Sequence, residues 1–99
     1  MWARVSTYEG SPDVIDDATT YDTEKIMPQV RQLDGFRGIY ALADRDTGRT
    51  MSITLWADED ALRASDREAD RLRQDATDHA EGRIVSVERF EVSFHEVVD

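Results

Sequence analysis

The order of the predicted strands and helices constrains this chain most, because a strand–helix–strand pattern occurs twice within its 99 residues. That doubling is typical of a ferredoxin-like, split βαβ (β-α-β-β-α-β) arrangement with an antiparallel sheet, which is an α+β fold. Helices can cover only one face of such a sheet. Because the strands carry apolar residues on both faces, we expect a second sheet, most simply from an identical partner, to cover the other face. A single domain over residues 1–99 is expected.

The first half of the chain is predicted to contain one strand and one long helix. Larger or polar side chains alternate with smaller or apolar ones over residues 2–8, which is typical of a strand. A helix over residues 12–33 follows, with Ser11 as a favourable N-cap. Pro28 lies inside this helix and lacks a backbone donor, so we expect a kink or a break near residues 24–27.

The second half is predicted to contain a hairpin, a second helix and a final strand. These elements are expected at residues 36–44, 49–56, 58–82 and 83–98, with a turn at 45–48 between the first two. The second helix is expected to pack closely, because most residues on its inner face are small: Ala61, Leu62, Ser65, Ala69, Leu72 and Ala76. Its outer face is expected to be solvated and contains Arg67, Asp70, Arg71, Arg73 and Asp78.

The final predicted strand is unusually long, and the face that carries its apolar residues changes midway. Val85 and Val87 lie on one face, whereas Phe90 and Phe94 lie on the other. A bulge near residues 88–89 explains the change, and so does a strand that leaves its own sheet. We favour the second interpretation, in which the strand reaches a partner chain.

Composition excludes several classes of function. The chain has 22 acidic and 12 basic residues and a net charge of −10 without any basic run, so we expect no nucleic-acid and no membrane partner. It has no cysteine, which excludes thiolate chemistry and suits a cytoplasmic protein. The N-terminus does not resemble a signal peptide. His79 is expected to cap a helix and His95 to contact a partner, so neither a metal nor another cofactor is predicted.

Two segments resemble the antibiotic-biosynthesis monooxygenase-like family. Residues 53–62 (ITLWADEDAL) place an aromatic residue at the end of a strand, followed by an acidic turn and Ala-Leu at the start of a helix. Residues 82–92 (GRIVSVERFEV) are similar to the fourth strand of that family. The resemblance covers nearly the whole chain. It implies a homodimer in which two sheets form an eight-stranded α+β barrel, with a small cavity between each sheet and its helices.

Five side chains are candidates for a substrate-binding site. This fold would direct some of four side chains into a common cavity, namely those of Tyr8, Asp22, Tyr40 and Trp56. Arg4 is the natural counter-ion of Asp22 or of an acidic ligand. Tyrosine hydroxyls orient an aromatic substrate. An aspartate on an apolar stripe holds a phenol, or acts as a base if burial raises its pKa. The structural alternatives are that Trp56 belongs to the core and that Asp22 pairs with an arginine such as Arg4.

Three functions remain open at this point. The resemblance implies binding of a small aromatic or apolar molecule and monooxygenase chemistry without a cofactor. The alternative is a non-catalytic dimeric scaffold or sensor whose pocket is closed by its own side chains. A third is dehydratase or lyase chemistry, for which Asp22 is the only good base. Haem-degrading relatives use an asparagine, and the chain contains none, which argues against that activity.

Overall fold

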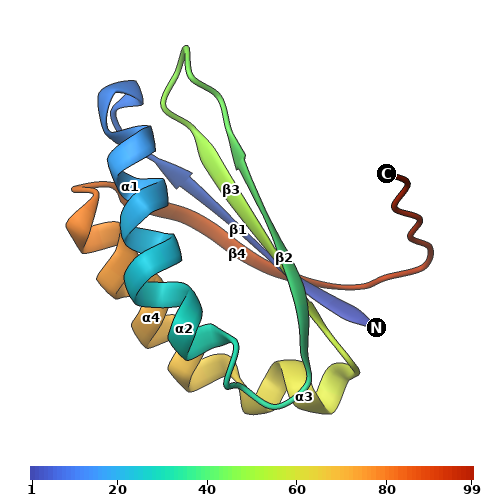
Figure 1. Cartoon of the computed structure of the whole chain (residues 1–99). Helices are drawn as coiled ribbons and strands as arrows, with labels where there is room; N and C mark the ends of the chain where they lie inside the picture. The colour runs from blue at the N-terminus through green and yellow to red at the C-terminus, as the bar shows by residue number, and fades with distance from the viewer.

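A four-stranded antiparallel sheet carries all of the helices on one of its faces in the computed structural model, which describes residues 1–99 (Figure 1). The strands are β1 (Trp2–Glu9), β2 (Phe36–Ala43), β3 (Thr50–Trp56) and β4 (Arg83–Glu91), in the spatial order β2-β3-β1-β4. The predicted β-α-β-β-α-β order is confirmed. The strands start and end within one residue of their predicted boundaries, except that the last one ends earlier than predicted.

The register of the sheet decides which side chains face the helices. Arg4 lies opposite Thr54, and Ser6 lies opposite Ser52. Because neighbouring residues on a strand point to opposite faces, these four polar residues share the face that the helices cover. That covered face therefore contains hydroxyl and guanidinium groups where a simple core would have aliphatic side chains.

The first predicted helix is present, but its middle turn is wider than an α-helix. It consists of the 3-10 turn η1 (Pro12–Val14), α1 (Ile15–Tyr21), the π-helical turn η2 (Asp22–Ile26) and α2 (Met27–Val30). Pro28 can neither donate to the carbonyl four residues earlier nor approach it closely. The backbone adapts by widening the preceding turn, with the Met27 N–H bonded to the Asp22 carbonyl. The expected distortion is thus a π turn without a break in the chain direction (Figure 1).

The second predicted helix is divided into α3 (Glu59–Ala64) and α4 (Asp66–His79). Asp58 caps α3 by accepting a hydrogen bond from the Ala61 N–H at 2.8 Å, as its position before an acidic turn indicates. The division falls at Ser65, which is buried. None of the helices has the length and the apolar character needed to cross a membrane.

The final strand is shorter than predicted. A bulge interrupts its pairing with β1, where Thr7 pairs with Ser86 but Tyr8 pairs with Ile84, so it lies earlier than residues 88–89, where a bulge is the less favoured of the two interpretations. The strand ends at Glu91, and residues 92–99 leave the sheet and project away from the body of the molecule (Figure 1). Within one copy of the chain this segment has no strand to pair with, which is why the predicted strand to Val98 is not formed.

The first prediction concerns the turn between β2 and β3. Gly48 has a φ of +82°, and a Cβ there would lie 2.0 Å from the Gly10 carbonyl oxygen. Gly48→Ala should lower the free energy of unfolding by at least about 2 kcal/mol, measured by urea denaturation, because strain and a backbone clash act together. Gly10→Ala is the matched control, since its Cβ would meet nothing closer than 3.9 Å. Equal losses for the two variants would contradict the prediction.

Candidate ligand-binding site

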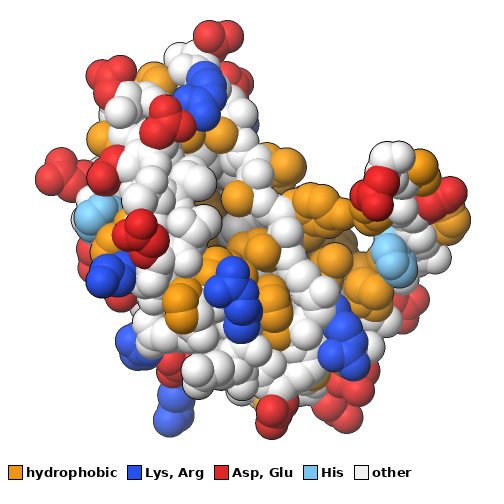
Figure 2. Space-filling model, viewed as in Figure 1, with side chains coloured by type: hydrophobic (Ala, Val, Ile, Leu, Met, Phe, Trp, Pro, Cys, Tyr) orange, Lys and Arg blue, Asp and Glu red, His pale blue; other side chains and the backbone are white.

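A cavity of about 460 Å³ lies between the first helix, α4 and the covered face of the sheet. Figure 2 shows the surface hollowed beside the first helix, with apolar side chains around the depression. The apolar wall is formed mainly by Ile26, Met27, Val30 and Leu72, which are all buried and in mutual contact. Known small-molecule pockets span roughly 300–1,000 Å³, so this cavity has room for a ring-containing ligand.

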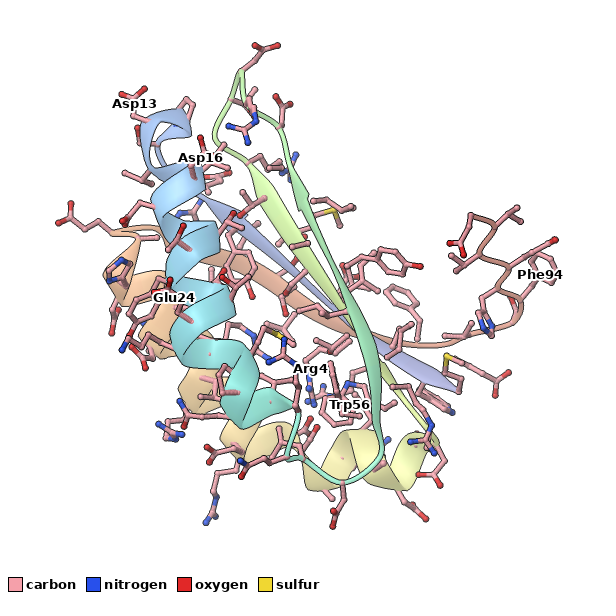
Figure 3. The ribbon with its side chains drawn as sticks, in the orientation of Figure 1. Arg4, Asp13, Asp16, Glu24, Trp56 and Phe94 are labelled. Atoms are coloured by element: carbon pink, nitrogen blue, oxygen red, sulfur yellow. The ribbon has the colours of Figure 1, made fainter.

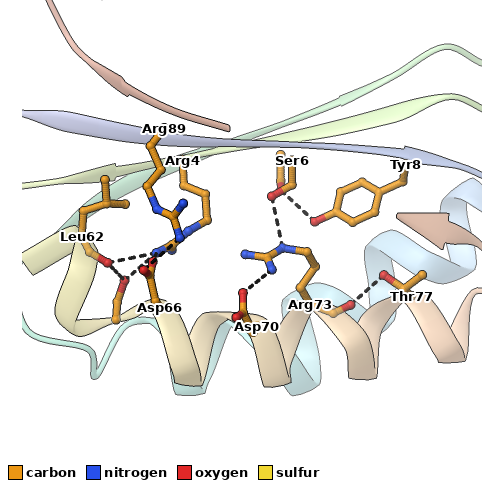
Figure 4. A network of polar contacts seen from close by, with 11 residues as sticks. Arg4, Ser6, Tyr8, Leu62, Asp66, Asp70, Arg73, Thr77 and Arg89 are labelled. Atoms are coloured by element: carbon orange, nitrogen blue, oxygen red, sulfur yellow. Dashed lines mark hydrogen bonds and ion pairs between the residues drawn. The ribbon is translucent and has the colours of Figure 1, made fainter. Parts of the chain in front are cut away.

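Arg4 forms the most extensive polar group of the site. Its side chain is 3% exposed, and Nη2 donates to the Leu62 carbonyl at 3.0 Å, to Ser65 Oγ at 3.0 Å and to Asp66 Oδ1 at 2.5 Å (Figure 4). Burial lowers the pKa of Arg4, and the Asp66 carboxylate offsets part of that effect. A guanidinium this basic stays protonated, so the site holds a permanent positive charge.

Asp66 is shared between two arginines. Arg89 Nη2 lies 2.8 Å from Asp66 Oδ2, while Arg4 occupies the other oxygen. Burial would raise the pKa of Asp66, but the hydrogen bonds from Arg89 and Arg4 outweigh it and keep the pKa below its usual range. The aspartate is therefore ionised and firmly held. It is unavailable as a base for a ligand.

Two nitrogen atoms of Arg4 have no partner. Nε and Nη1 are buried and form no hydrogen bond, although the residue lines the cavity. The Arg4 guanidinium carbon lies 5.5 Å from the centre of the Trp56 ring, and Figure 3 shows these two side chains next to each other beneath the first helix. A π face stabilises the charge but accepts a hydrogen bond only weakly. The two donors are thus unpaired and enclosed by the protein.

A second arginine reaches the cavity from α4. Arg73 Nε donates to Ser6 Oγ at 3.2 Å, and Nη1 donates to Asp70 Oδ1 at 2.7 Å (Figure 4). Its side chain is only 8% exposed, so its assignment to a solvated outer face is wrong. Arg73 follows Ala69 by four positions and precedes Ala76 by three. Helical spacing alone would have indicated that it borders the inner face.

Asp22 is the isolated carboxyl group of the cavity. It opens the π turn, lines the cavity and makes no side-chain hydrogen bond or ion pair. Burial raises its pKa from 3.8 to about 6, and the charge of nearby His79 opposes the rise. The suggested ion pair with Arg4 is not formed, because Asp66 occupies that arginine. A carboxyl group with this pKa changes its charge just below neutral pH and is suited to accept a proton.

The two tyrosine candidates lie on opposite faces of the sheet. Tyr8 lines the cavity, and its hydroxyl is 3.1 Å from Ser52 Oγ. Tyr40 pairs with Ile53 of β3. The neighbours of Ile53, Ser52 and Thr54, face the helices, so Ile53 and Tyr40 point to the opposite, open face of the sheet. Tyr40 is 46% exposed there. The structure therefore brings four of the five candidates to one cavity and leaves Tyr40 outside it. β2 is apolar at nearly every position, so its sequence did not indicate which face is inward.

Trp56 combines the two roles considered for it. It is 1% exposed, contacts Phe36 edge-to-face with a centroid distance of 5.6 Å and donates from Nε1 to Thr54 Oγ1 at 3.0 Å. It also lines the cavity. Trp56 is thus a core residue, one part of which forms the wall beside Arg4.

His79 joins the two helices instead of only capping one. Its ring stacks on Tyr21 with a centroid distance of 3.8 Å, and Nε2 lies 3.0 Å from Asp17 Oδ2. Tyr21 in turn donates to Asp75 Oδ1 at 2.7 Å. These contacts tie α1 to α4 beside Asp22 but outside the apolar wall. No group of three potential ligand side chains is arranged to hold a metal ion.

Comparison with curated proteins gives relatives of undefined function, and no family model matches the chain. The uncharacterized protein Rv2558 of Mycobacterium tuberculosis is 32% identical over 65 residues, which are 66% of this chain and 28% of that protein. The uncharacterized protein Rv2557 of the same organism is 27% identical over 93 residues, which are 94% of this chain and 41% of that protein. The chain thus spans less than half the length of these relatives.

Solved structures are similar over nearly the whole chain. The monooxygenase ActVA-Orf6 of Streptomyces coelicolor, solved with nanaomycin D, matches with a TM-score of 0.71 and 16% identity over 99% of this chain and 91% of that one. The chain has the fold of the antibiotic-biosynthesis monooxygenases. SnoaB of Streptomyces nogalater, a cofactor-independent oxygenase, matches with a TM-score of 0.61 and 17% identity over 98% and 95% of the two chains. The resemblance expected from residues 53–62 and 82–92 is confirmed for the fold.

The second prediction uses the raised pKa of Asp22. Between pH 3.8 and about 6 the folded protein holds a proton that the unfolded chain has released, so stability falls as pH rises through this window. Above this pH window, the ionised Asp22 lowers the free energy of unfolding by up to about 3 kcal/mol. Asp22→Asn should therefore stabilise the fold at about pH 8 by roughly 1–3 kcal/mol in urea denaturation, and have little effect near pH 3.5.

Asp46→Asn, at the exposed tip of the β2–β3 turn, is the control and should change stability by less than about 0.5 kcal/mol at either pH. A loss of stability at about pH 8 for Asp22→Asn would mean that the fold stabilises the carboxylate, which contradicts a pKa raised by burial.

Proposed function

We propose that this protein is a homodimer that binds a small aromatic or apolar molecule and acts as a monooxygenase that needs no cofactor. The observation that carries the proposal is the cavity of about 460 Å³, which combines an apolar wall with the isolated carboxyl group of Asp22. The fold shared with ActVA-Orf6 and SnoaB supports it, since these are a monooxygenase and a cofactor-independent oxygenase. Fold alone does not determine chemistry, so we infer the reaction from the residues of the cavity.

The proposed reaction converts an activated methylene group to a carbonyl. In an anthrone-like substrate the CH₂ between two rings is acidic, and its anion gives up electrons readily. The balanced reaction is R₂CH₂ + O₂ → R₂C=O + H₂O, in which the substrate supplies all the electrons. Asp22 accepts the first proton, which its pKa of about 6 allows at neutral pH. The Tyr8 hydroxyl, bonded to Ser52, orients the ring oxygen atoms.

The open face of the sheet supports dimerisation. Tyr40, Leu42 and Phe90 are 46–49% exposed there. The register places Tyr40 beside Ile53, and Phe90 beside Ala3, on the same face. A continuous apolar sheet surface of this kind marks an interface in most proteins. The sheet of a second copy is the proposed occupant, and the two sheets would then form the expected barrel.

The alternative scaffold function predicted a pocket closed by its own side chains. A cavity of about 460 Å³ gives that version little support. A non-catalytic binding protein of the same shape would bind the ligand without consuming oxygen. Dehydratase or lyase chemistry at Asp22 would likewise proceed without oxygen. The cytoplasmic location expected from the absence of cysteine stays a prediction.

The third prediction tests the chemistry with dithranol, a 9-anthrone. Purified protein should accelerate oxygen uptake over buffer alone in the presence of a metal chelator, and the rate should rise as pH increases through about 6, where Asp22 ionises. Asp22→Asn should lose at least about tenfold of the protein-dependent rate. Binding of the anthrone with no protein-dependent uptake would favour a non-catalytic binding function instead.

The fourth prediction tests the dimer. Phe94 is 80% exposed in the projecting C-terminal segment (Figure 3). Phe94→Asp should give monomer or insoluble protein by light scattering after gel filtration, because a charge would be buried against the partner. Thr20→Asp adds the same charge at an exposed position on α1 and should leave the dimer intact. A Phe94→Asp dimer as stable as the unmodified one would remove this segment from the interface.

A further inference from the structure

The floor of the cavity is cationic, although the protein as a whole has a net charge of −10. Arg4, Arg73 and Arg89 gather where β1 and β4 face α4, and two carboxylates, Asp66 and Asp70, pair with them. Figure 4 shows this network between the strands and the helix. Three permanent positive charges face two negative ones, so one positive charge is uncompensated as long as Asp22, which also lines the cavity, is protonated. Arg4 and Arg73 both line the cavity.

The uncompensated charge coincides with unused hydrogen-bond donors. Arg4 Nε and Nη1 are buried without an acceptor, in a side chain that is only 3% exposed. Native proteins rarely leave buried donors unpaired, because the lost hydration is not replaced. Because both atoms are enclosed by the protein, a ligand in the cavity meets the positive charge of Arg4 and does not contact these two donors. A negatively charged ligand would stabilise that charge.

Arg73 provides the direct contact with such a ligand. Its Nε and Nη1 are engaged with Ser6 and Asp70, which fixes the plane of the guanidinium group. Nη2 forms no hydrogen bond within the protein. It is not enclosed as the unpaired nitrogen atoms of Arg4 are, so a ligand can reach it. A fixed guanidinium with one free edge is suited to an anionic oxygen, because a charge-assisted hydrogen bond is about twice as strong as a neutral one.

We infer that the cavity selects ligands that carry one acidic oxygen group, a carboxylate or an ionised enol or phenol, on an apolar ring body, with Arg73 as the direct contact and Arg4 as the charge behind it. The inference rests on the proposed function and narrows its substrate class. The apolar wall of Ile26, Met27 and Val30 excludes a small hydrophilic anion as the best occupant. A purely apolar aromatic molecule would fit the wall but would leave the free Nη2 of Arg73 without an acceptor.

The test compares two probes of nearly equal shape, naphthalene-2-carboxylate and naphthalene-2-carboxamide. Isothermal titration calorimetry of the full chain at about pH 5.5, where Asp22 is mostly protonated and the probe carboxylate is ionised, should give an affinity at least about tenfold higher for the carboxylate. Arg73→Gln should remove this advantage, because it lowers the affinity for the carboxylate by a larger factor than the affinity for the amide. Arg73→Lys should keep part of it, because the charge is retained but the planar fork is lost.

Arg71→Gln is the matched control on the same helix, since Arg71 is exposed and paired with Glu68 outside the cavity. It should preserve the preference for the carboxylate. Arg4 is not used as the variant, because its loss would leave Asp66 with one partner fewer inside the fold. The near-ultraviolet circular dichroism of each variant should match that of the unmodified protein.

The outcomes separate this inference from the proposed function. Equal affinity for both probes, or an unchanged preference in Arg73→Gln, overturns the inference and leaves an apolar binding cavity. Binding of neither probe overturns the cavity proposal and the inference together. Displacement of the carboxylate probe by inorganic phosphate at similar concentration overturns the requirement for an apolar body. The inference is supported if the protein binds the carboxylate more tightly than the amide, and if substitution of Arg73 reduces this preference whereas substitution of Arg71 does not.

Discussion

The ion pair between the buried Arg4 and the partly exposed Asp66 connects the sheet to the helical layer, and the rest of the site depends on it. Arg4 comes from the central strand β1, while its three acceptors lie around the junction of α3 and α4. Loss of Asp66 would leave the buried charge of Arg4 without its counter-ion. Breaking a fully buried pair costs roughly 3–5 kcal/mol, and the cost here is smaller because Asp66 is 30% exposed. The pair therefore fixes where α4 crosses the sheet. The position of Arg73 on α4 follows from that crossing.

The break between α3 and α4 is what makes the pair possible. Within a continuous helix the Leu62 carbonyl would accept from the backbone N–H of residue 66. At this junction no such backbone bond is formed, and the carbonyl instead accepts from Ser65 Oγ at 2.7 Å and from Arg4. A small hydroxyl residue at the junction thus converts a helix interior into an acceptor site. The helix predicted over residues 58–82 is therefore divided at Ser65 into α3 and α4.

Most of the fold could be predicted from the sequence, whereas the site could be predicted only in part. Alternation, caps and turn residues are local signals, so the strands and the start of α3 were accessible. Asp22 was found because it interrupts an apolar stripe. Tyr40 and Arg73 were misjudged because the face that a side chain occupies depends on the register of the sheet and on the width of the apolar stripe, which are set by tertiary packing.

The polar groups that face the helices have a cost in stability that a purely structural domain would avoid. Aliphatic side chains at Ser6, Ser52 and Thr54 would fill the cavity and add hydrophobic stabilisation of about 1.5–3 kcal/mol for each fully buried side chain. The sequence instead has hydroxyl groups there, a half-buried Asp22 and a guanidinium with unpaired donors.

Such features are typical of sites at which stability is given up for binding or chemistry. At physiological ionic strength a charge is screened beyond about 8 Å, so the negative surface acts weakly inside the cavity. A ligand that enters it is therefore selected by the nearest charges, which are those of Arg4 and Arg73 and, once it ionises above about pH 6, that of Asp22.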